Sequence, residues 1–161
     1  MGLLTPLAVR IGAIPWMPRL LPQIVWVDEH LQQWSGHRVS VLDLAGLPNL
    51  MLTVPGRKTG LPRATPLLCV PFEGDQLVAG SYFGGPKLPV WVINLRAAGT
   101  AEVRMGRRSW RVTAHEAAPG PERDRLWEAM IEVWPNYRLY EQKTDRLIPV
   151  FRLSPESPVA A

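Results

Sequence analysis

Hydrophobic residues in this chain fall into short runs separated by proline and glycine, a pattern typical of short strands joined by tight connections. The run at residues 50–54 predicts a strand. Residues 64–72 and 76–82 predict a hairpin across a polar turn, and residues 100–105 and 109–114 predict a second hairpin across a basic turn that contains glycine. Together these runs indicate a protein built mainly from β-strands.

Helical spacing of apolar residues appears in the second half of the chain. Residues 89–97 and residues 121–134 each open with a proline, which is favourable in the first turn of a helix. A further short helix places Tyr137 and Tyr140 on one face, three residues apart. Residues 147–153 then predict a closing strand.

Several short strands with two or three inserted helices predict an α+β, mainly β, fold. We expect a small barrel with helical decoration rather than a doubly wound sheet. The length of 161 residues fits one domain with its own core. We expect this domain at residues 37–153, between an apolar N-terminal arm at residues 1–36 and a mobile tail at residues 154–161.

The N-terminal arm is strongly apolar at residues 3–27 and carries Trp16 and Trp26. A membrane span needs about 20 uninterrupted apolar residues, whereas two arginines and four prolines interrupt this segment. No basic residue precedes it and no small-residue cleavage site stands out, so a secretory signal is poorly supported. Two interpretations stay open: a segment lying on the membrane surface, or an arm packed on the domain or on a second subunit. Residues 27–34 and 39–44 predict a helix and a strand that lead into the domain.

The chain is basic, with a formal net charge of +4. This charge fits an anionic ligand, an anionic membrane surface or nucleic acid, and does not choose among them. Cys69 is the only cysteine and lies in an apolar run, so it predicts a core residue and excludes an intramolecular disulfide. His30, His37 and His115 lack ligand spacing, and we therefore expect no protein-bound metal. No Ser-His-Asp arrangement or nucleophile elbow is evident either.

Three segments could carry chemistry, and the first is the turn at residues 56–60 followed by Arg63. Its glycines allow a ligand to approach closely, while Arg57, Lys58 and Arg63 offer charge-assisted donors to an anion. The glycine spacing is not that of a P-loop. Taken alone, the turn is also compatible with a merely solvated basic loop.

The other two segments combine flat aromatic rings with polar groups. In residues 80–95 a glycine-rich strand exit leads into the helix that opens with proline, where Trp91 and Asn94 lie about one turn apart. In residues 134–140 a tryptophan and two tyrosines suit an aromatic acceptor, since a tyrosine has an apolar ring and a polar tip. A plain loop, a core tryptophan and ordinary aromatic packing are the alternatives.

Together these segments resemble the deazaflavin-dependent nitroreductase family, also described as F-420-dependent quinone reductases. The first matching pattern is L-T-x-x-G-R-K-[ST]-G-x-x-R-x-T-P-L, at residues 52–67. The second is S-x-x-G-x-P-x-x-P-x-W-x-x-N-L, at residues 81–95, and the third is [WY]-P-x-Y-x-x-Y-x-x-x-T-x-R-x-I-P-V-F, at residues 134–151. The resemblance covers roughly residues 45–153 in order and with compatible spacing, which is far more specific than any one pattern.

The resemblance implies a split β-barrel, like that of FMN-binding split-barrel proteins, which holds coenzyme F-420 in a groove. The reaction it implies is hydride transfer from the reduced 5-deazaflavin to a quinone, of menaquinone type, or to a nitroaromatic acceptor. The coenzyme-binding residues it implies are Arg57, Lys58, Thr59, Arg63, Pro66, Lys87, Trp91 and Asn94. The residues it implies on the acceptor side are Ser81, Trp134, Tyr137 and Tyr140. Tyr82 and Phe83 depart from some members, which carry Lys and Gly there, and put the acceptor range in doubt.

A reduced deazaflavin donates hydride directly, so the protein need supply only binding, orientation and electrostatics. This fits a sequence without an evident acid-base dyad. The alternatives are a split-barrel oxidoreductase that uses FMN, and a non-catalytic coenzyme or lipid binder. Nothing like a recognition helix supports nucleic-acid binding. We expect a cytoplasmic protein that can contact the inner face of the cell membrane through its arm, either monomeric or homodimeric.

Overall fold

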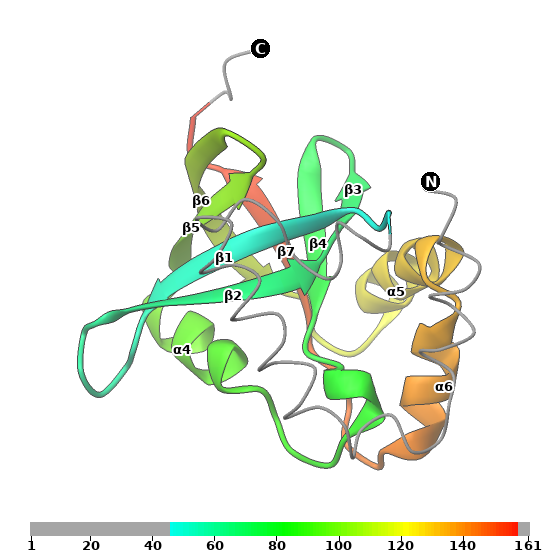
Figure 1. Cartoon of the computed structure of the whole chain (residues 1–161). Helices are drawn as coiled ribbons and strands as arrows, with labels where there is room; N and C mark the ends of the chain where they lie inside the picture. Colours follow the sequence, from blue (N-terminus) through cyan, green and yellow to red (C-terminus); the bar gives the residue numbers. More distant parts are fainter. Residues whose placement is uncertain (1–45, 158–161) are drawn as a thin grey trace.

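The computed structural model describes residues 46–157 (Figure 1). The N-terminal arm at residues 1–36, with the helix and strand predicted at residues 27–34 and 39–44, lies outside the described residues. The described elements are β1 (Asn49–Pro55), β2 (Pro62–Leu68), β3 (Val70–Phe72), β4 (Asp75–Ala79), the 3-10 helix η2 (Tyr82–Gly84), α4 (Val90–Ala98), β5 (Thr100–Met105), β6 (Arg108–Glu116), α5 (Pro121–Val133), α6 (Asn136–Lys143) and β7 (Val150–Pro155).

One antiparallel sheet of seven strands, in the order β2-β1-β5-β6-β7-β4-β3, forms the described part of the fold. Figure 1 shows β1 and β2 crossing over β4 and β7, with α4 on one side and with α5 and α6 on the other. Although β2 and β4 are far apart in the strand order, they are in contact, because the sheet curls on itself. The predicted mainly β barrel with inserted helices is therefore confirmed.

The core has two parts, because the curled sheet packs helices at both ends. Alternation along β1 buries Leu50, Leu52 and Val54, as expected for a strand with one face inward. These residues join α4 in one cluster, which also holds Trp91 and Phe151. The second cluster lies between α5, α6 and the strands β3, β4 and β7, and its buried aromatic residues are Trp127, Trp134, Tyr137 and Tyr140.

Two strand boundaries differ from the sequence prediction, and each difference has a cause in contacts with distant parts of the chain. The predicted strand at residues 64–72 is two strands, β2 and β3, which pair with different partners. The break falls at Cys69, whose backbone N–H donates to the Pro48 carbonyl at 3.0 Å. The closing strand begins at Val150 rather than at Leu147, because the carbonyls of Ile148 and Pro149 accept hydrogen bonds from outside the sheet, from the Arg123 side chain and the Gly80 backbone.

The ends of β4 and β7 also differ from the prediction. Strand β4 stops at Ala79, and Tyr82 enters η2 with a positive φ of 46°, which is incompatible with a continuing strand. Strand β7 continues to Pro155, past the predicted domain boundary at residue 153, because Ser154 and Pro155 pair with β6.

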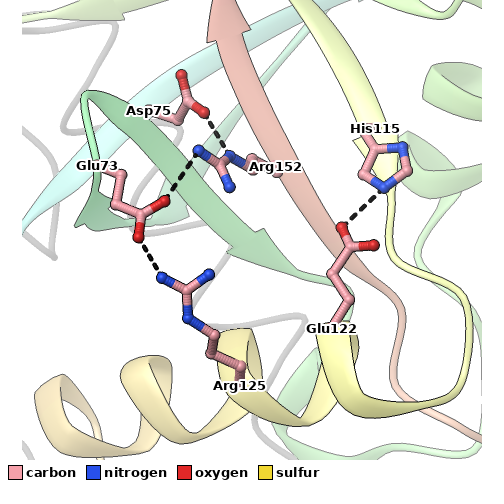
Figure 2. Close-up of polar contacts among 6 residues, drawn as sticks. All are labelled: Glu73, Asp75, His115, Glu122, Arg125 and Arg152. Carbon is pink, nitrogen blue, oxygen red and sulfur yellow. Dashed lines mark hydrogen bonds and ion pairs between the residues drawn. The ribbon is translucent and has the colours of Figure 1, made fainter.

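The turn between β3 and β4 is tied to the rest of the fold by charged side chains (Figure 2). Glu73 forms ion pairs with Arg125 of α5 and with Arg152 of β7, and Asp75 also pairs with Arg152. Both guanidinium groups lie over the Phe72 ring, at 4.9 and 5.4 Å from its centroid. The Glu73–Arg125 pair is exposed, and such pairs contribute at most about 1 kcal/mol, whereas the Asp75–Arg152 pair is partly buried. Together the pairs tie the β3–β4 turn to α5 and β7.

Candidate functional site

The basic turn between β1 and β2 is closed by its own hydrogen bonds. The Gly56 N–H donates to the Leu61 carbonyl at 2.8 Å, and the Gly60 N–H donates to the Gly56 carbonyl at 2.8 Å. The Thr59 hydroxyl accepts from the Leu61 N–H at 3.2 Å. The turn therefore has a defined backbone that can present side chains in a fixed arrangement.

The cations of this turn point to solvent while its backbone is anchored to the core. The side chains of Arg57, Lys58 and Arg63 are exposed, and no ion pair within residues 46–157 involves them. Asn94, only 3% exposed on α4, accepts a hydrogen bond from the Arg57 backbone N–H through Oδ1 at 3.1 Å. The fold thus brings Asn94 and the basic turn, two of the predicted coenzyme-binding features, into direct contact.

The remaining predicted coenzyme residues lie on α4, on β2 and in the segment before α4. Trp91 is buried in the core and packs on Phe151, with the ring centroids 5.8 Å apart. Pro66 is half-buried on β2, opposite Met51 of β1, and Lys87 is exposed in the segment that precedes α4. Of this group, Trp91 offers the least free surface, so packing is the larger part of its role in the described structure.

The predicted acceptor-side aromatics form a buried cluster on α6 and at its start. Trp134 donates from Nε1 to the Tyr140 hydroxyl at 3.3 Å, and the Asn136 side chain also hydrogen bonds with this hydroxyl. The rings of Tyr137 and Tyr140 meet edge to face, with centroids 6.0 Å apart, and Tyr137 also packs against Trp127 at 5.1 Å. The fold therefore unites all three aromatic residues, mostly inside the core.

The surroundings of both tyrosine hydroxyls raise their pKa values above that of an ordinary tyrosine. Burial raises the pKa of Tyr140 to about 12, against smaller lowering effects of the hydrogen bonds with Trp134 and Asn136. Burial also raises the pKa of Tyr137 well above its ordinary value, and the neighbouring Tyr140 raises it further. Each phenol therefore stays protonated at neutral pH and can act as a neutral hydrogen-bond group.

Ser81 lies in a loop whose backbone carbonyls accept hydrogen bonds from the Arg146 side chain. Arg146 donates from Nη1 to the Gly80 carbonyl at 2.9 Å, from Nη2 to the Ser81 carbonyl at 3.0 Å, and from Nε to the Gly85 carbonyl at 3.2 Å. No role was predicted for Arg146. Its only sequence signal is its place in the third matching pattern, as the arginine of T-x-R-x-I-P.

The same loop rests directly on α6, so Ser81 and the aromatic cluster belong to one structural unit (Figure 1). Gly84 has a φ of 75°, and a Cβ on it would lie 2.8 Å from the Tyr140 carbonyl oxygen and 2.9 Å from Lys143 Cβ. Only glycine fits such a close approach. The Lys143 ammonium also lies 5.7 Å from the centroid of the Tyr140 ring.

A separate cavity of about 310 Å³ lies between the end of α4, the end of β6 and the start of α5. Its lining contains an exposed ion pair, Arg96 with Glu116 at 2.6 Å. None of the residues that line it belongs to the predicted site: Arg96, Glu116, Ala117, Ala118, Pro119, Arg123, Leu147 and Pro149. The predicted residues instead form two groups, the basic turn with Asn94 and the Ser81 loop with the aromatic cluster of α6.

His115 is exposed and lies 2.9 Å from the Glu122 carboxylate (Figure 2). Across residues 46–157 no group of three or more His, Cys, Asp or Glu side chains is arranged to hold a metal ion.

Cys69 is buried, as predicted, and burial raises the pKa of its thiol to about 12. In that same part of the chain, no helix has the length and apolar character needed to cross a membrane.

The curled antiparallel sheet with its inserted helices defines a split-barrel protein, and comparisons with known proteins agree. Residues 26–155 match the model of the family described as F420H2-dependent quinone reductase, in which F420H2 denotes reduced coenzyme F-420. An F420H2-dependent quinone reductase of Mycobacterium tuberculosis is 35% identical over 121 residues, which is 74% of this chain and 78% of the relative. The chain belongs to this family.

Two solved structures support the same conclusion. An F420-H2 dependent reductase shares 38% identity with a TM-score of 0.62, over 66% of this chain and 94% of that one. A second protein, solved as a domain-swapped dimer, shares 34% identity with a TM-score of 0.63, over 80% of this chain and 97% of that one. The heme storage protein HutZ of Vibrio cholerae, at 13% identity and a TM-score of 0.54 over 83% of this chain and 93% of that one, shares the fold alone.

Family membership confirms the resemblance that the three sequence patterns indicated. The split-barrel fold, the oxidoreductase class and coenzyme F-420 as the cofactor of the family are confirmed with it. The family description names quinones as the acceptors of its members.

Proposed function

We propose that this chain transfers a hydride from reduced coenzyme F-420 to a quinone of menaquinone type, with nitroaromatic compounds as further acceptors. The observation that carries the proposal is the anchored basic turn. Arg57, Lys58 and Arg63 converge there without an ion-pair partner in the described part of the chain, and Asn94 fixes the backbone between them and the core.

This turn fits the anionic part of the coenzyme, its phosphate and acidic tail. Two guanidinium groups and one ammonium group at the end of a hairpin give charge-assisted hydrogen bonds to phosphate and carboxylate oxygens. We expect Thr59 beside them, Lys87 nearby, and Pro66, Trp91 and Asn94 along the deazaflavin ring or its linker.

When bound, reduced F-420 supplies the hydride. The chain then has to hold the acceptor close to the ring, exclude water and stabilise the negative charge that develops on a quinone oxygen. The Ser81 hydroxyl and the phenols of Tyr137 and Tyr140 are the groups we propose for this task, with Trp134 as a flat apolar wall. Both phenols are protonated throughout the physiological pH range, as ordinary tyrosines are, and burial raises the pKa of each further, so they can donate hydrogen bonds there.

The apolar segment at residues 3–27 supports a lipid-soluble acceptor and a peripheral contact with the inner face of the cell membrane. Deleting residues 1–27 should reduce both binding to vesicles of anionic phospholipid and turnover of a long-chain menaquinone. Unchanged binding and turnover would remove the membrane from the proposal while leaving the F-420 chemistry intact.

The first experiment is a fluorescence titration of the purified protein with F-420, NADPH and FMN, followed by quinone turnover with reduced F-420. We expect tight binding of F-420 alone, weakened about fivefold to tenfold by Lys58→Met, since an ammonium–phosphate contact is worth about 1 kcal/mol or more. The matched control is Arg107→Met, in the turn between β5 and β6. Because β5 runs antiparallel to β1, with Met51 opposite Arg104, this turn lies at the end of β1 away from the basic turn. Preference for FMN, or binding without turnover, would favour the alternative oxidoreductase or the non-catalytic binder.

A further inference from the structure

We propose that Arg146 is a positioning residue for acceptor reduction, which acts by fixing the direction of Ser81. The inference rests on the proposed function, because it assumes that the Ser81 hydroxyl contacts the acceptor. Arg146 acts through the loop of residues 80–85, which follows β4 and leads toward α4.

Arg146 makes three hydrogen bonds to one loop with three different nitrogen atoms. The accepting carbonyls belong to Gly80, Ser81 and Gly85, which are 61 to 66 positions away in the sequence. No ion pair within the described residues involves Arg146, and burial lowers the pKa of its guanidinium without removing the charge. The carbonyl dipoles of this loop are therefore the groups that compensate its charge.

The loop needs such a constraint, because its backbone is strained. Tyr82 has a φ of 46°, a left-handed conformation that a tyrosine seldom adopts and that persists only where the surroundings impose it. On one side, Gly84 lies against Tyr140 and Lys143 of α6, as described above. On the other side, the three bonds from Arg146 hold the peptide groups before and after Tyr82.

Ser81 lies at the centre of this arrangement. Its own carbonyl accepts from Arg146 Nη2 at 3.0 Å and from the Gly84 N–H at 2.9 Å, so both lone-pair directions of that oxygen are engaged. With the peptide plane fixed and φ and ψ held at −76° and −35°, the Cα–Cβ bond of Ser81 has one direction. A lysine at position 146 has a single donor centre and cannot span three carbonyls, so it would release this direction while keeping the charge.

The test is a double-mutant cycle with Arg146→Lys and Ser81→Ala, measured on quinone reduction by reduced F-420. We expect Arg146→Lys to lower kcat about tenfold, the scale of a misplaced contact group, with the dissociation constant of F-420 unchanged within about twofold. In the Ser81→Ala background the same substitution should lower kcat by less than about twofold. Arg125→Lys is the matched control: it removes an arginine that also anchors a loop, the β3–β4 turn, and we expect it to leave kcat unchanged (Figure 2).

A loss of the same size in both backgrounds would overturn the inference, because Arg146 would then act on the fold and not through Ser81. If Arg146→Lys does not fold, Thr144→Val provides a milder change, since the Thr144 hydroxyl accepts from the Arg146 backbone N–H at 3.3 Å. We expect it to lower kcat about threefold, again only when Ser81 is present. Absence of any turnover by the unsubstituted protein would overturn the proposed function itself and this inference with it, a result distinct from additive losses in an active enzyme.

Discussion

Asn94 of α4 holds the basic turn in place through a single hydrogen bond, in which its Oδ1 accepts from the Arg57 backbone N–H at 3.1 Å. The amide is buried, so solvent cannot readily replace it. This bond links the hydrophobic core directly to the basic turn between β1 and β2, which we propose as the coenzyme site. It explains how an exposed turn with three cations can keep one backbone conformation.

The bond makes Asn94→Ala a test of anchoring. Losing the acceptor leaves the Arg57 N–H without its partner, which costs about 1–2 kcal/mol. We expect the dissociation constant of F-420 to rise about tenfold, and the free energy of unfolding to fall by about 1–2 kcal/mol. Fluorescence titration and urea unfolding check the two values. Arg107→Ala, on the turn at the other end of β1, should change neither, and an unaltered affinity in Asn94→Ala would contradict the anchoring role.

The buried tyrosines predict a loss of stability at alkaline pH. The pKa of Tyr140 is raised from 10.0 to about 12, so its folded-state proton is held more tightly than its unfolded-state proton. The stabilisation is complete below pH 10 and is lost as pH rises from 10 through 12, and it amounts to roughly 2–3 kcal/mol. Tyr140→Phe should therefore flatten the decline of the unfolding free energy over this range, although the variant loses the bond from Trp134 at neutral pH. Thermal melts from pH 8 to 12 compare the slopes, and equal slopes would exclude Tyr140 as the cause.

Burial of Cys69 predicts a thiol that is inert in the folded protein. The thiolate is the reactive form, and a pKa of about 12 leaves very little of it at neutral pH. We expect reaction with a disulfide reagent such as DTNB to require unfolding, with the labelling rate following urea concentration across the unfolding transition. Rapid labelling of the native protein would show that the core around Cys69 opens far more often than its burial indicates.

Local signals in the sequence were sufficient to predict most of the fold. Prolines and helical spacing predicted α4 and α5 closely, and two short runs flanking a basic turn with glycine predicted the hairpin of β5 and β6. The break at Cys69 was not predicted, since residues 64–72 read as one apolar run. The change of strand partner there depends on Pro48 and on the curl of the whole sheet, which a local pattern does not contain.

In the candidate site, too, features formed by neighbouring residues were predicted from the sequence, and contacts between distant residues were not. The basic turn was identified because its glycines and cations are adjacent in the sequence. The anchoring bond of Asn94 and the loop contacts of Arg146 join residues separated by 37 and by 61 to 66 positions. In each case a backbone group is the partner, and backbone groups are the same at every position of a sequence. The residue type alone therefore could not reveal either role.

Tyr82 supports a prediction about acceptor size. Tyr82 is 41% exposed. Its ring lies against Gly85 of the same loop, where a Cβ on the glycine would be 3.0 Å from Tyr82 Cδ1. The residue is adjacent to Ser81, which we propose on the acceptor side, and we therefore expect its exposed ring to limit the size of the acceptor. Replacing Tyr82 with glycine removes this bulk and also relieves the left-handed strain at φ 46°.

We therefore expect Tyr82→Gly to raise kcat/KM for a bulky naphthoquinone about fivefold relative to a small benzoquinone, a change of about 1 kcal/mol in selectivity. The dissociation constant of F-420 should stay the same, because the basic turn and Asn94 are untouched. Tyr82→Phe is the matched control: it keeps the ring and the strain, and its selectivity should equal that of the unsubstituted protein. If the phenylalanine variant shifts selectivity as far as the glycine variant does, then the hydroxyl matters and the ring does not. If neither variant shifts it, the acceptor enters by a route that avoids Tyr82.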